Sequence, residues 1–420
     1  MTRRVAVVGG GWAGLAAAVE ACSRGHAVSL FEMSAQLGGR ARKVDLGDTV
    51  VDNGQHILIG AYLQTLALMR RVGVPVDEAL LRTPLALVGP DGGGLVLPRG
   101  AAVPAFARAV LTNPHWGWRD RFSLLGAATG WALRGFRCAP RLSVAELCAG
   151  IRPRVLEQLI EPLCVAALNT PAHQASAGVF LRVLKDALFS GAGSADLLLP
   201  RRHLSALLPE PAGHWLTQAG AELRLGQRVM SIAAGDGGWS VDGERFDAVV
   251  LAAPALEAAR LARPHAAAWA DAAEALRYQP IVTVYAQSLG SRLPRPMIAL
   301  SSPPAQYVFD LGQLRAQPGW LAFVISGAQP WVERGMEATA LATLAQAREE
   351  LGAHLGEPLS LRRALTEKRA TFCCTPELVR PAQRIAPGLV AAADYCEGPY
   401  PATLEGAVRS GLAAIDGLSA

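Results

Sequence analysis

The chain opens on a pattern of apolar and polar positions that predicts a buried strand followed by a helix. Residues 5–8, VAVV, are consecutive apolar residues, which is typical of a parallel strand buried on both faces. The glycine-rich stretch GGGWAG follows directly, and LAAAVEACSRG then has the apolar content and length of a helix. A second apolar run, AVSLFE at residues 27–32, predicts the next strand. We therefore expect a strand, a glycine turn, a helix and a second strand in this order.

Three glycines in the first turn, Gly9, Gly11 and Gly14, have the spacing of a dinucleotide-binding turn. The first glycine allows a tight bend, the second lets the backbone approach a pyrophosphate, and the third lets helix and strand pack closely. The helix N-terminus offers free N–H groups and a positive dipole end to the phosphates. Glu32 ends the second strand, where its carboxylate can accept hydrogen bonds from both hydroxyls of an adenosine ribose. The pattern predicts a bound dinucleotide.

The residues after Glu32 distinguish between NAD and FAD. Segment 33–45, MSAQLGGRARKVD, contains a second glycine pair, Gly38 and Gly39, followed by Arg40. A second phosphate-facing turn with an arginine suits the longer FAD molecule, because its pyrophosphate needs neutralisation as it leaves the first helix. We therefore predict FAD as the cofactor.

Length and charge limit the classes of protein to which the chain can belong. With 420 residues, of which 51% are hydrophobic, it can bury a large core and form two or three domains. The formal net charge of +5 comes almost entirely from arginines, and these are scattered along the sequence. We expect no nucleic-acid partner, because such partners require clustered basic residues.

The cysteines and the N-terminus bear on the compartment. The seven cysteines are an odd number without a CxxC pair, so they form neither a disulfide framework nor a zinc motif, and a reducing cytoplasm is expected. The first residues, MTRRVAVVGGGWAGLAAAVEA, have features of a signal peptide, but their glycine spacing favours the cofactor turn. No stretch reaches about 18 uncharged, mainly apolar residues, so no transmembrane helix is expected.

Two motifs resemble the FAD-dependent amine oxidase and phytoene desaturase superfamily. The LGGR segment after the ribose acid is similar to its N-terminal pattern, and residues 388–415, GLVAAADYCEGPYPATLEGAVRSGLAAI, are similar to its closing FAD motif. The resemblance implies that Asp394 binds the ribityl chain. It also implies that Thr403, Leu404 and Ala407 lie at a helix start near N1 and O2 of the flavin. A helix N-terminus at that place would stabilise the anionic reduced flavin.

The resemblance implies an α/β fold, with a discontinuous Rossmann-like FAD-binding domain and an α+β substrate-binding domain. Residues 221–254 read as several short strands with turns at GDGG and DG. In the superfamily such an insertion returns to the cofactor domain, which places Val229 over the adenine; an independent β-rich module is the alternative. The expected FAD-binding segments are 1–75, 195–262 and 370–420, and the expected substrate-binding segments are 76–194 and 263–369.

Several longer stretches are similar to the hydroxysqualene dehydroxylase branch of this superfamily, which serves bacterial hopanoid and squalene synthesis. They include VDNGQHILIGAY at 51–62, PLCVAALNTPAHQASAGVF at 162–180 and SADLLLPRRHLS at 194–205. The resemblance implies that reduced FAD delivers a hydride to an allylic carbon of hydroxysqualene as the hydroxyl leaves as water. An apolar isoprenoid substrate, an unidentified electron donor and neighbouring squalene-pathway enzymes are the partners that it implies.

Such a reaction needs an acid near the leaving oxygen, a dry pocket and an apolar tunnel. The candidate acids are His56, Asp196 and Tyr395, and for each the alternative is a structural role. DNGQH resembles a segment that runs beside the flavin ring, where Gly54 would allow close approach. Asp52 is expected to accept hydrogen bonds from backbone N–H groups. Because it and His56 lack a third ligand nearby, no metal site is expected.

Residues 103–142 interleave tryptophan and phenylalanine with arginine. This pattern suits short helices at a membrane interface, where rings lie at headgroup depth and guanidinium groups meet anionic lipid. An ordinary buried helical cap with a solvated arginine face is the alternative. The first interpretation predicts a cytoplasmic protein that binds peripherally to the inner membrane.

Three other functions remain open at this level. A carotenoid or phytoene-type desaturase has the same fold and runs the hydride from substrate to FAD. Another flavin oxidase of an apolar substrate is a second alternative; an amine oxidase fits less well, because only 6% of the residues are aromatic. A non-catalytic isoprenoid carrier on the same scaffold is the third, although such carriers lack an intact flavin site.

Overall fold

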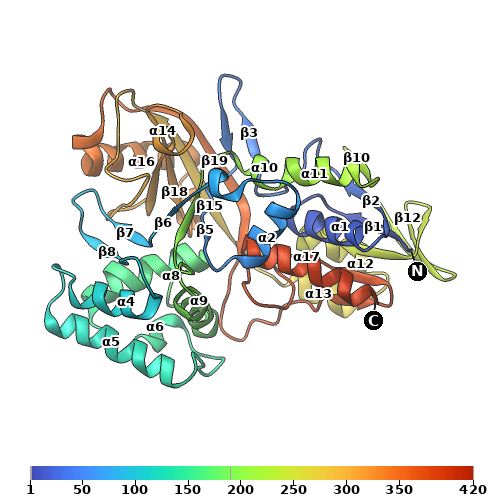
Figure 1. Ribbon diagram of the computed structural model, residues 1–420, viewed down its shortest axis with the longest axis horizontal. Coiled ribbons are helices and arrows are strands. Elements are labelled where there is room, and N and C mark those ends of the chain that lie inside the picture. The colour runs from blue at the N-terminus through green and yellow to red at the C-terminus, as the bar shows by residue number, and fades with distance from the viewer. Residues whose placement is uncertain (1, 190, 420) are drawn as a thin grey trace.

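Two β-sheets with helices on their faces organise the computed structural model, which describes residues 2–189 and 191–419 (Figure 1). One sheet lies beside both chain ends, and the other lies at the opposite end of the molecule. The Arg3 guanidinium donates a hydrogen bond to the carbonyl oxygen of Leu418, which holds the two ends of the chain together. This arrangement confirms the predicted α/β class.

The first sheet is parallel except for its edge strand β20, and its central strands are buried on both faces. Strands from residues 4–32, 222–251 and 384–391 hydrogen-bond to one another within it, so widely separated parts of the sequence meet there. The predicted domain boundaries themselves stay a prediction. In spatial order the strands are β10 (Glu222–Leu225), β2 (Ala27–Glu32), β1 (Arg4–Val8), β14 (Ala248–Leu251), β21 (Leu389–Ala391) and β20 (Arg384–Ala386).

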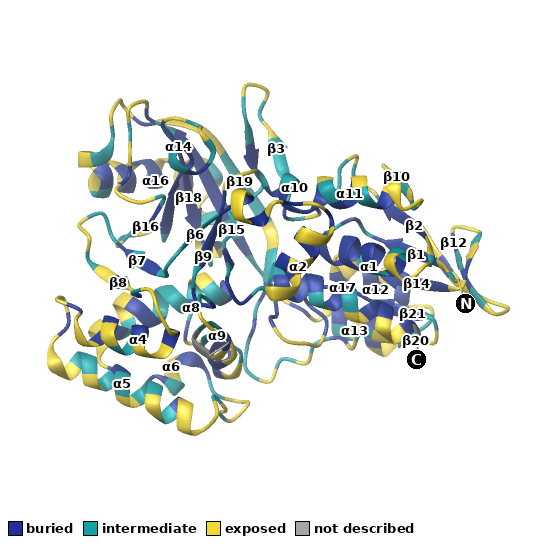
Figure 2. Ribbon diagram, viewed as in Figure 1, coloured by how far each residue is buried: buried dark blue, intermediate teal, exposed yellow. Residues whose placement is uncertain are grey.

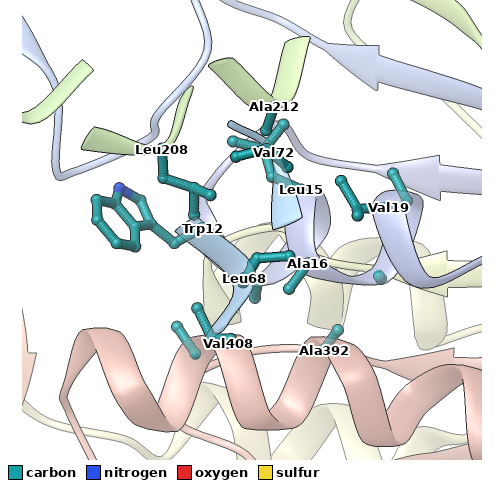
Figure 3. Close-up of a cluster of buried hydrophobic side chains, with 14 of the residues drawn as sticks. Trp12, Leu15, Ala16, Val19, Leu68, Val72, Leu208, Ala212, Ala392 and Val408 are labelled. Carbon is teal, nitrogen blue, oxygen red and sulfur yellow. The ribbon is translucent and has the colours of Figure 1, made fainter. Parts of the chain in front are cut away.

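Helices α1 (Trp12–Ser23) and α17 (Leu404–Ser419) cover one face of this sheet. They approach closely because their contact is made of small residues: a Cβ on Gly411 would lie 2.2 Å from the carbonyl oxygen of Ala13. The same apolar cluster includes residues of α2 (Leu63–Arg71), α10 (Leu204–Leu207) and α11 (Pro209–Gln218). Figure 3 labels Trp12, Leu15, Ala16, Val19, Leu68, Val72, Leu208, Ala212, Ala392 and Val408 from this cluster.

The opposite face of the first sheet packs against α12 (Ala255–Ala262), α13 (Ala267–Glu274) and a small antiparallel sheet. The small sheet consists of β11 (Ile232–Gly235), β12 (Gly238–Val241) and β13 (Glu244–Phe246). The chain enters the small sheet after β10 and leaves it for β14. Trp239 and Phe246 bury their rings against the larger sheet. The short strands expected in 221–254 therefore attach to the first sheet and form no separate core.

The second sheet is antiparallel and carries apolar residues on both faces. Its strands, in spatial order, are β16 (Met297–Ala299), β17 (Tyr307–Asp310), β18 (Trp320–Ile325), β15 (Tyr278–Gln287) and β19 (Ser360–Phe372). One face is covered by α15 (Gln329–Glu333) and α16 (Met336–Leu351), which η2 (Gly352–His354) follows.

The other face of the second sheet contributes to an apolar layer, which we define by Val51, Leu197, Leu199, Tyr285, Met297, Tyr307, Phe309, Leu311, Leu314, Trp320, Ala322 and Val324. Strand β9 supplies two of these residues, so a small sheet covers this face. The elements around the layer are β3 (Lys43–Asp45), β4 (Val50–Asp52), β5 (Leu58–Ile59), α3 (Val76–Ala79), β6 (Leu80–Thr83), β7 (Ala86–Val88), β8 (Gly94–Val96), β9 (Leu197–Pro200) and α14 (Leu311–Arg315).

A helical cap completes the molecule next to β7 and β8 (Figure 1). Trp116 and Trp131 are buried in it, whereas Trp118 and Phe122 are 65% and 60% exposed. Figure 2 shows the exposed stripes on α4 and α5. The helices are α4 (Ala102–Leu111), α5 (Trp118–Leu133), α6 (Val144–Leu147), α7 (Pro153–Val155), η1 (Leu156–Ile160), α8 (Glu161–Leu168) and α9 (Ala177–Phe189).

Candidate functional site

The first glycine turn joins β1 to α1, and each glycine suits its position for a different reason. Gly9 has φ +114°, and a Cβ there would lie 2.4 Å from the carbonyl oxygen of Ala252. A Cβ on Gly14 would lie 1.9 Å from the carbonyl oxygen of Gly9, so the helix approaches the strand only without a side chain. On Gly11 the nearest contact would be the Cα of Gly39 at 4.0 Å. The turn therefore leaves room at Gly11, at the N-terminus of α1.

The Glu32 carboxylate lies over this turn. One of its oxygens accepts a hydrogen bond from the Gly10 N–H at 2.7 Å, and the other accepts one from the Ser34 N–H at 2.8 Å. A carboxylate has about four acceptor sites, so two remain for the ribose hydroxyls. The two backbone bonds hold the carboxylate in place at the end of β2, as a ribose ligand requires.

The second glycine turn packs directly on the first. The Gly38 N–H donates to the Gly10 carbonyl oxygen at 2.8 Å, and a Cβ on Gly39 would lie 3.2 Å from the Cα of Gly11. Gly38 and Gly39 have φ values of +116° and +57°, which favour glycine. The sequence predicted two phosphate-facing turns, and the structure brings them together.

Arg40 and Asp394 form an ion pair between the two ends of the sequence. Their side chains meet at 2.6 Å, and Arg40 also donates to the carbonyl oxygen of Ala370 at 2.7 Å. Burial lowers the pKa of Arg40, but the adjacent Asp394 carboxylate outweighs this effect and keeps the pKa above its ordinary value. Only 7% of Asp394 is exposed. The predicted pyrophosphate and ribityl ligands are therefore neighbours.

Thr403 caps α17 at the same edge of the first sheet. Its Oγ1 accepts a hydrogen bond from the Gly406 N–H at 2.9 Å and donates to the Tyr400 carbonyl oxygen at 2.7 Å. Leu404 begins the helix and Ala407 follows in its first turn. The predicted helix start at the closing motif is thus present, and its N–H groups provide a positive partial charge.

Val229 lies in the loop after β10, close to Glu32. The Gln227 N–H donates to the Glu32 carbonyl oxygen at 3.0 Å, and Arg260 donates to the Val229 carbonyl oxygen at 2.8 Å. The Val229 side chain is 3% exposed and packs with Phe31 in the apolar cluster of this face. This position beside the ribose acid is compatible with the predicted contact to adenine.

The predicted cofactor residues line the carboxyl ends of the parallel strands, where ligands bind in such sheets. They provide an acid for a ribose, room and helix N–H groups for a pyrophosphate, and a carboxylate followed by a second helix N-terminus. The donor set fits a molecule as long as FAD, and the role of each residue stays a prediction.

Segment 53–56 follows β4 and lies beside β15. The Tyr285 hydroxyl of β15 donates to the Asp52 carbonyl oxygen at 2.8 Å. The His56 Nδ1 lies 2.8 Å from the Gly54 carbonyl oxygen, so this nitrogen carries the proton in the neutral ring and leaves Nε2 available. Burial lowers the pKa of His56, and Arg315 is among the charges that lower it further. The ring is therefore mainly neutral at pH 7.

Asp52 is fully buried and has a structural role. Its Oδ1 accepts a hydrogen bond from the Leu204 N–H at 2.8 Å, which satisfies a backbone donor at the start of α10. Its Oδ2 pairs with the Arg315 guanidinium at 2.5 Å, and the side chains are 0% and 6% exposed. Sequence reasoning missed Arg315, because no local pattern around α14 indicates that it reaches Asp52.

The two other candidate acids have partners of their own. Asp196 pairs with Arg82 at 3.1 Å on the side of β9. The Tyr395 hydroxyl donates to the Ala253 carbonyl oxygen at 3.0 Å, and burial raises the pKa of Tyr395 well above its ordinary value. Within residues 2–189 and 191–419, no hydrogen bond joins any two of His56, Asp196 and Tyr395. Their catalytic roles stay predictions.

Two further findings concern metals and membranes. In the described part of the chain, no group of three or more His, Cys, Asp or Glu side chains is arranged to hold a metal ion. The helices in the same residues are all too short or too polar to cross a lipid bilayer.

Comparisons with known proteins give one family and several relatives. The sequence profile described as "Flavin containing amine oxidoreductase" matches residues 12–288. A hydroxysqualene dehydroxylase of Rhodopseudomonas palustris is 29% identical, over 99% of this chain and 98% of its own length. Another from Sinorhizobium fredii is 26% identical, over 99% and 98%. A zeta-carotene desaturase of Synechocystis is 27% identical, over only 54% of this chain and 50% of its own length.

The fold is shared with solved structures at low sequence identity. An oxidoreductase from Methanosarcina mazei superposes with a TM-score of 0.74 at 16% identity, covering 98% of this chain and 100% of the other. At this identity the likeness concerns the fold alone, and it agrees with the arrangement of the two sheets described above.

Proposed function

The chain belongs to the flavin-containing amine oxidoreductases, and from this premise we propose that it removes the hydroxyl group of hydroxysqualene to give squalene. It is an FAD-dependent oxidoreductase. The observation that carries the proposal is the similarity to hydroxysqualene dehydroxylases over nearly the whole chain. The similarity to the zeta-carotene desaturase, by contrast, covers only about half of the chain. The names of these full-length relatives also support an apolar isoprenoid substrate.

The reaction balances with one hydride and one proton. When bound in its reduced form, FAD supplies a hydride to the allylic carbon. The carbon–oxygen bond breaks, the hydroxyl takes up a proton, and water leaves. The protein must exclude other water, because water would recapture the allylic cation. A separate reductant must return two electrons to the flavin after each turnover.

His56 is the candidate that best suits proton delivery. Its Nδ1 is held by the Gly54 carbonyl oxygen, so the imidazolium would donate from Nε2. The surrounding layer is apolar, which strengthens interactions with the reacting groups by keeping the local dielectric low. Asp196 is less suited to this role, because its carboxylate pairs with Arg82.

We expect His56→Ala to lower hydroxysqualene turnover by roughly tenfold or more, since it removes the general acid. Because burial lowers the pKa of His56, the imidazolium is populated only at a more acidic pH than in an ordinary histidine. Wild-type turnover should therefore fall as pH rises through this lowered pKa, and the variant should lack that limb. Single-turnover flavin reoxidation across pH, with flavin content checked, measures both. Unchanged turnover in the variant would remove His56 from the candidates.

The reaction itself is tested by anaerobic incubation of the photoreduced holoenzyme with hydroxysqualene. The proposal predicts flavin reoxidation together with formation of squalene. Flavin reoxidation without squalene would contradict it. The oxidised holoenzyme incubated with zeta-carotene tests the desaturase alternative, for which the half-length similarity is the supporting observation.

We further propose that the helical cap binds the surface of an anionic membrane. Trp118 and Phe122 expose their rings one turn apart on α5, with ring centroids at 6.4 Å, and Arg119 lies over the Trp118 ring. The segment 103–142 carries six arginines and one aspartate. Exposed aromatic rings beside an excess of guanidinium groups match the headgroup region of an anionic bilayer. An apolar substrate would be available at such a surface.

Replacing Trp118 and Phe122 with serine should lower co-sedimentation with vesicles that contain anionic lipid, by roughly fivefold or more, because two inserted rings are lost. Leu341→Ser on α16 is the matched control, since Leu341 is 59% exposed on a helix at the other sheet. Equal binding by the double variant and the wild type would contradict membrane attachment through the cap.

A further inference from the structure

Among the buried polar atoms without a hydrogen-bond partner in the described residues, two lie on or beside segment 53–56 and a third lies on the second sheet. They are the Thr283 hydroxyl oxygen, the Gln55 amide nitrogen and the Tyr307 hydroxyl oxygen. Thr283 is 1% exposed and Tyr307 is 5% exposed. Buried polar groups without partners oppose folding, so a group of them beside a predicted reaction centre calls for a ligand that pairs with them.

The Thr283 hydroxyl and the His56 ring both lie close to Gly54. A Cβ built on Gly54 would lie 3.6 Å from the Thr283 Oγ1 and 4.0 Å from the His56 Cε1. The next residue on this face of β15, Tyr285, donates to the Asp52 carbonyl oxygen, so the strand runs alongside segment 52–56. Thr283 therefore points toward the part of the chain that carries His56.

The orientation of the Gln55 amide is fixed by its neighbour. Its Oε1 accepts a hydrogen bond from the Arg315 guanidinium at 3.1 Å. Because a guanidinium group only donates, the amide oxygen must face Arg315 and the Nε2 must face away from it. Arg315 is itself held by Asp52. The ion pair thus presents the Gln55 N–H₂ as a positioned donor.

Tyr307 extends the same row of the second sheet. Val324 of β18 pairs with Thr283 on one side and with Tyr307 on the other, so the two side chains project from the same face. Both Tyr307 and Val324 belong to the apolar layer. Polar atoms are thus placed beside, and within, an otherwise apolar layer.

We propose that Thr283, Gln55 and His56 form a binding site for the hydroxyl group of the substrate, with Tyr307 at its border. This proposal rests on the proposed function. It explains how the protein distinguishes the alcohol hydroxysqualene from the hydrocarbon product squalene. An alcohol offers one donor and two acceptor sites. Thr283 can accept its proton while the Gln55 N–H₂ donates to its oxygen, and His56 adds a second donor at Nε2 when its ring is protonated. A site of this kind binds the alcohol and releases squalene, which cannot pair with these groups.

Binding to the oxidised holoenzyme tests the site without chemistry, because oxidised flavin cannot donate a hydride. Thr283→Val keeps the shape of the side chain and removes the hydroxyl. We expect the dissociation constant for hydroxysqualene to rise about tenfold, with that for squalene unchanged. Thr283→Ser should restore the wild-type ratio. Thr343→Val on α16 is the control, since this buried threonine bonds to the Thr339 carbonyl oxygen within its own helix.

Two results of the same binding measurement would contradict the proposed site. If Thr283 only packs, Thr283→Val should leave the ratio of the two dissociation constants unchanged, and this outcome overturns the proposal. A changed flavin absorbance spectrum with an unchanged ratio would also overturn it, because Thr283 would then contact the cofactor. Squalene formation by the wild type separates the two proposals. If the wild type forms no squalene but Thr283→Val still weakens alcohol binding, only dehydroxylation is wrong.

Discussion

Replacing Arg315 with methionine is expected to destabilise the protein by about 3–5 kcal/mol, because it leaves a buried charge without its partner. The Asp52 side chain is fully buried, and Arg315, 2.5 Å away, is the cation that faces it. The change also removes the donor to Gln55 Oε1. The measurement is the denaturant midpoint of the holoprotein, read from the loss of helix signal and of flavin fluorescence quenching.

A double variant separates the charge effect from lost packing. Asp52→Asn in the Arg315→Met background removes the unpaired charge, while an asparagine oxygen can still accept the hydrogen bond of the Leu204 N–H. We expect the double variant to recover a large part of the lost stability, since replacing both partners of a buried pair often costs little. A single variant as stable as the wild type would show that the pair contributes nothing.

Gly14→Ala and Gly11→Ala are expected to fail in different ways. At Gly14 the added Cβ would overlap the Gly9 carbonyl oxygen, 1.9 Å away, so α1 and β1 must separate. We expect this variant to lose its flavin and to unfold at a clearly lower temperature. At Gly11 the nearest contact is 4.0 Å away, so the fold should persist while the methyl group occupies the space for the pyrophosphate.

The two glycine variants serve as controls for each other. The flavin-to-protein absorbance ratio should be low in both, by roughly tenfold or more where the pyrophosphate is blocked. When each variant is compared with wild-type protein stripped of its flavin, the unfolding temperature should fall only for Gly14→Ala, because bound flavin itself stabilises the fold. Full flavin content in Gly11→Ala would contradict the placement of the pyrophosphate beside the first turn.

The helical cap illustrates a limit of sequence patterns. Its interleaved tryptophans and arginines were compatible with a membrane surface and with a buried cap, and the structure divides them. Trp116 and Trp131 are buried, whereas Trp118 and Phe122 are exposed. The i and i+4 spacing places the exposed pair on one helix face, but which face of α5 meets the core depends on the helices packed against it.

The candidate site divides in the same way. Gly9, Gly14 and Glu32 could be predicted because a strand, a tight turn, a helix and a second strand follow one another in the sequence at a characteristic spacing. The ion pair between Asp52 and Arg315 could not be predicted, because nothing in the sequence around either residue indicates that the other is its partner. The unpaired hydroxyl of Thr283 could not be predicted either, because a threonine within an apolar strand is common and gives no sign that its hydroxyl lacks a partner.

By itself, the sequence determined the glycine turns, the strand and helix order around them, and the family resemblance, because these follow from short-range sterics and periodicity. The tertiary structure alone decided which distant residues meet: Arg40 with Asp394, 354 positions apart, and Thr65 with Glu405, 340 positions apart. Such pairs form because burying a charge requires a partner wherever the packing of the sheets brings one, and sequence distance does not enter that requirement.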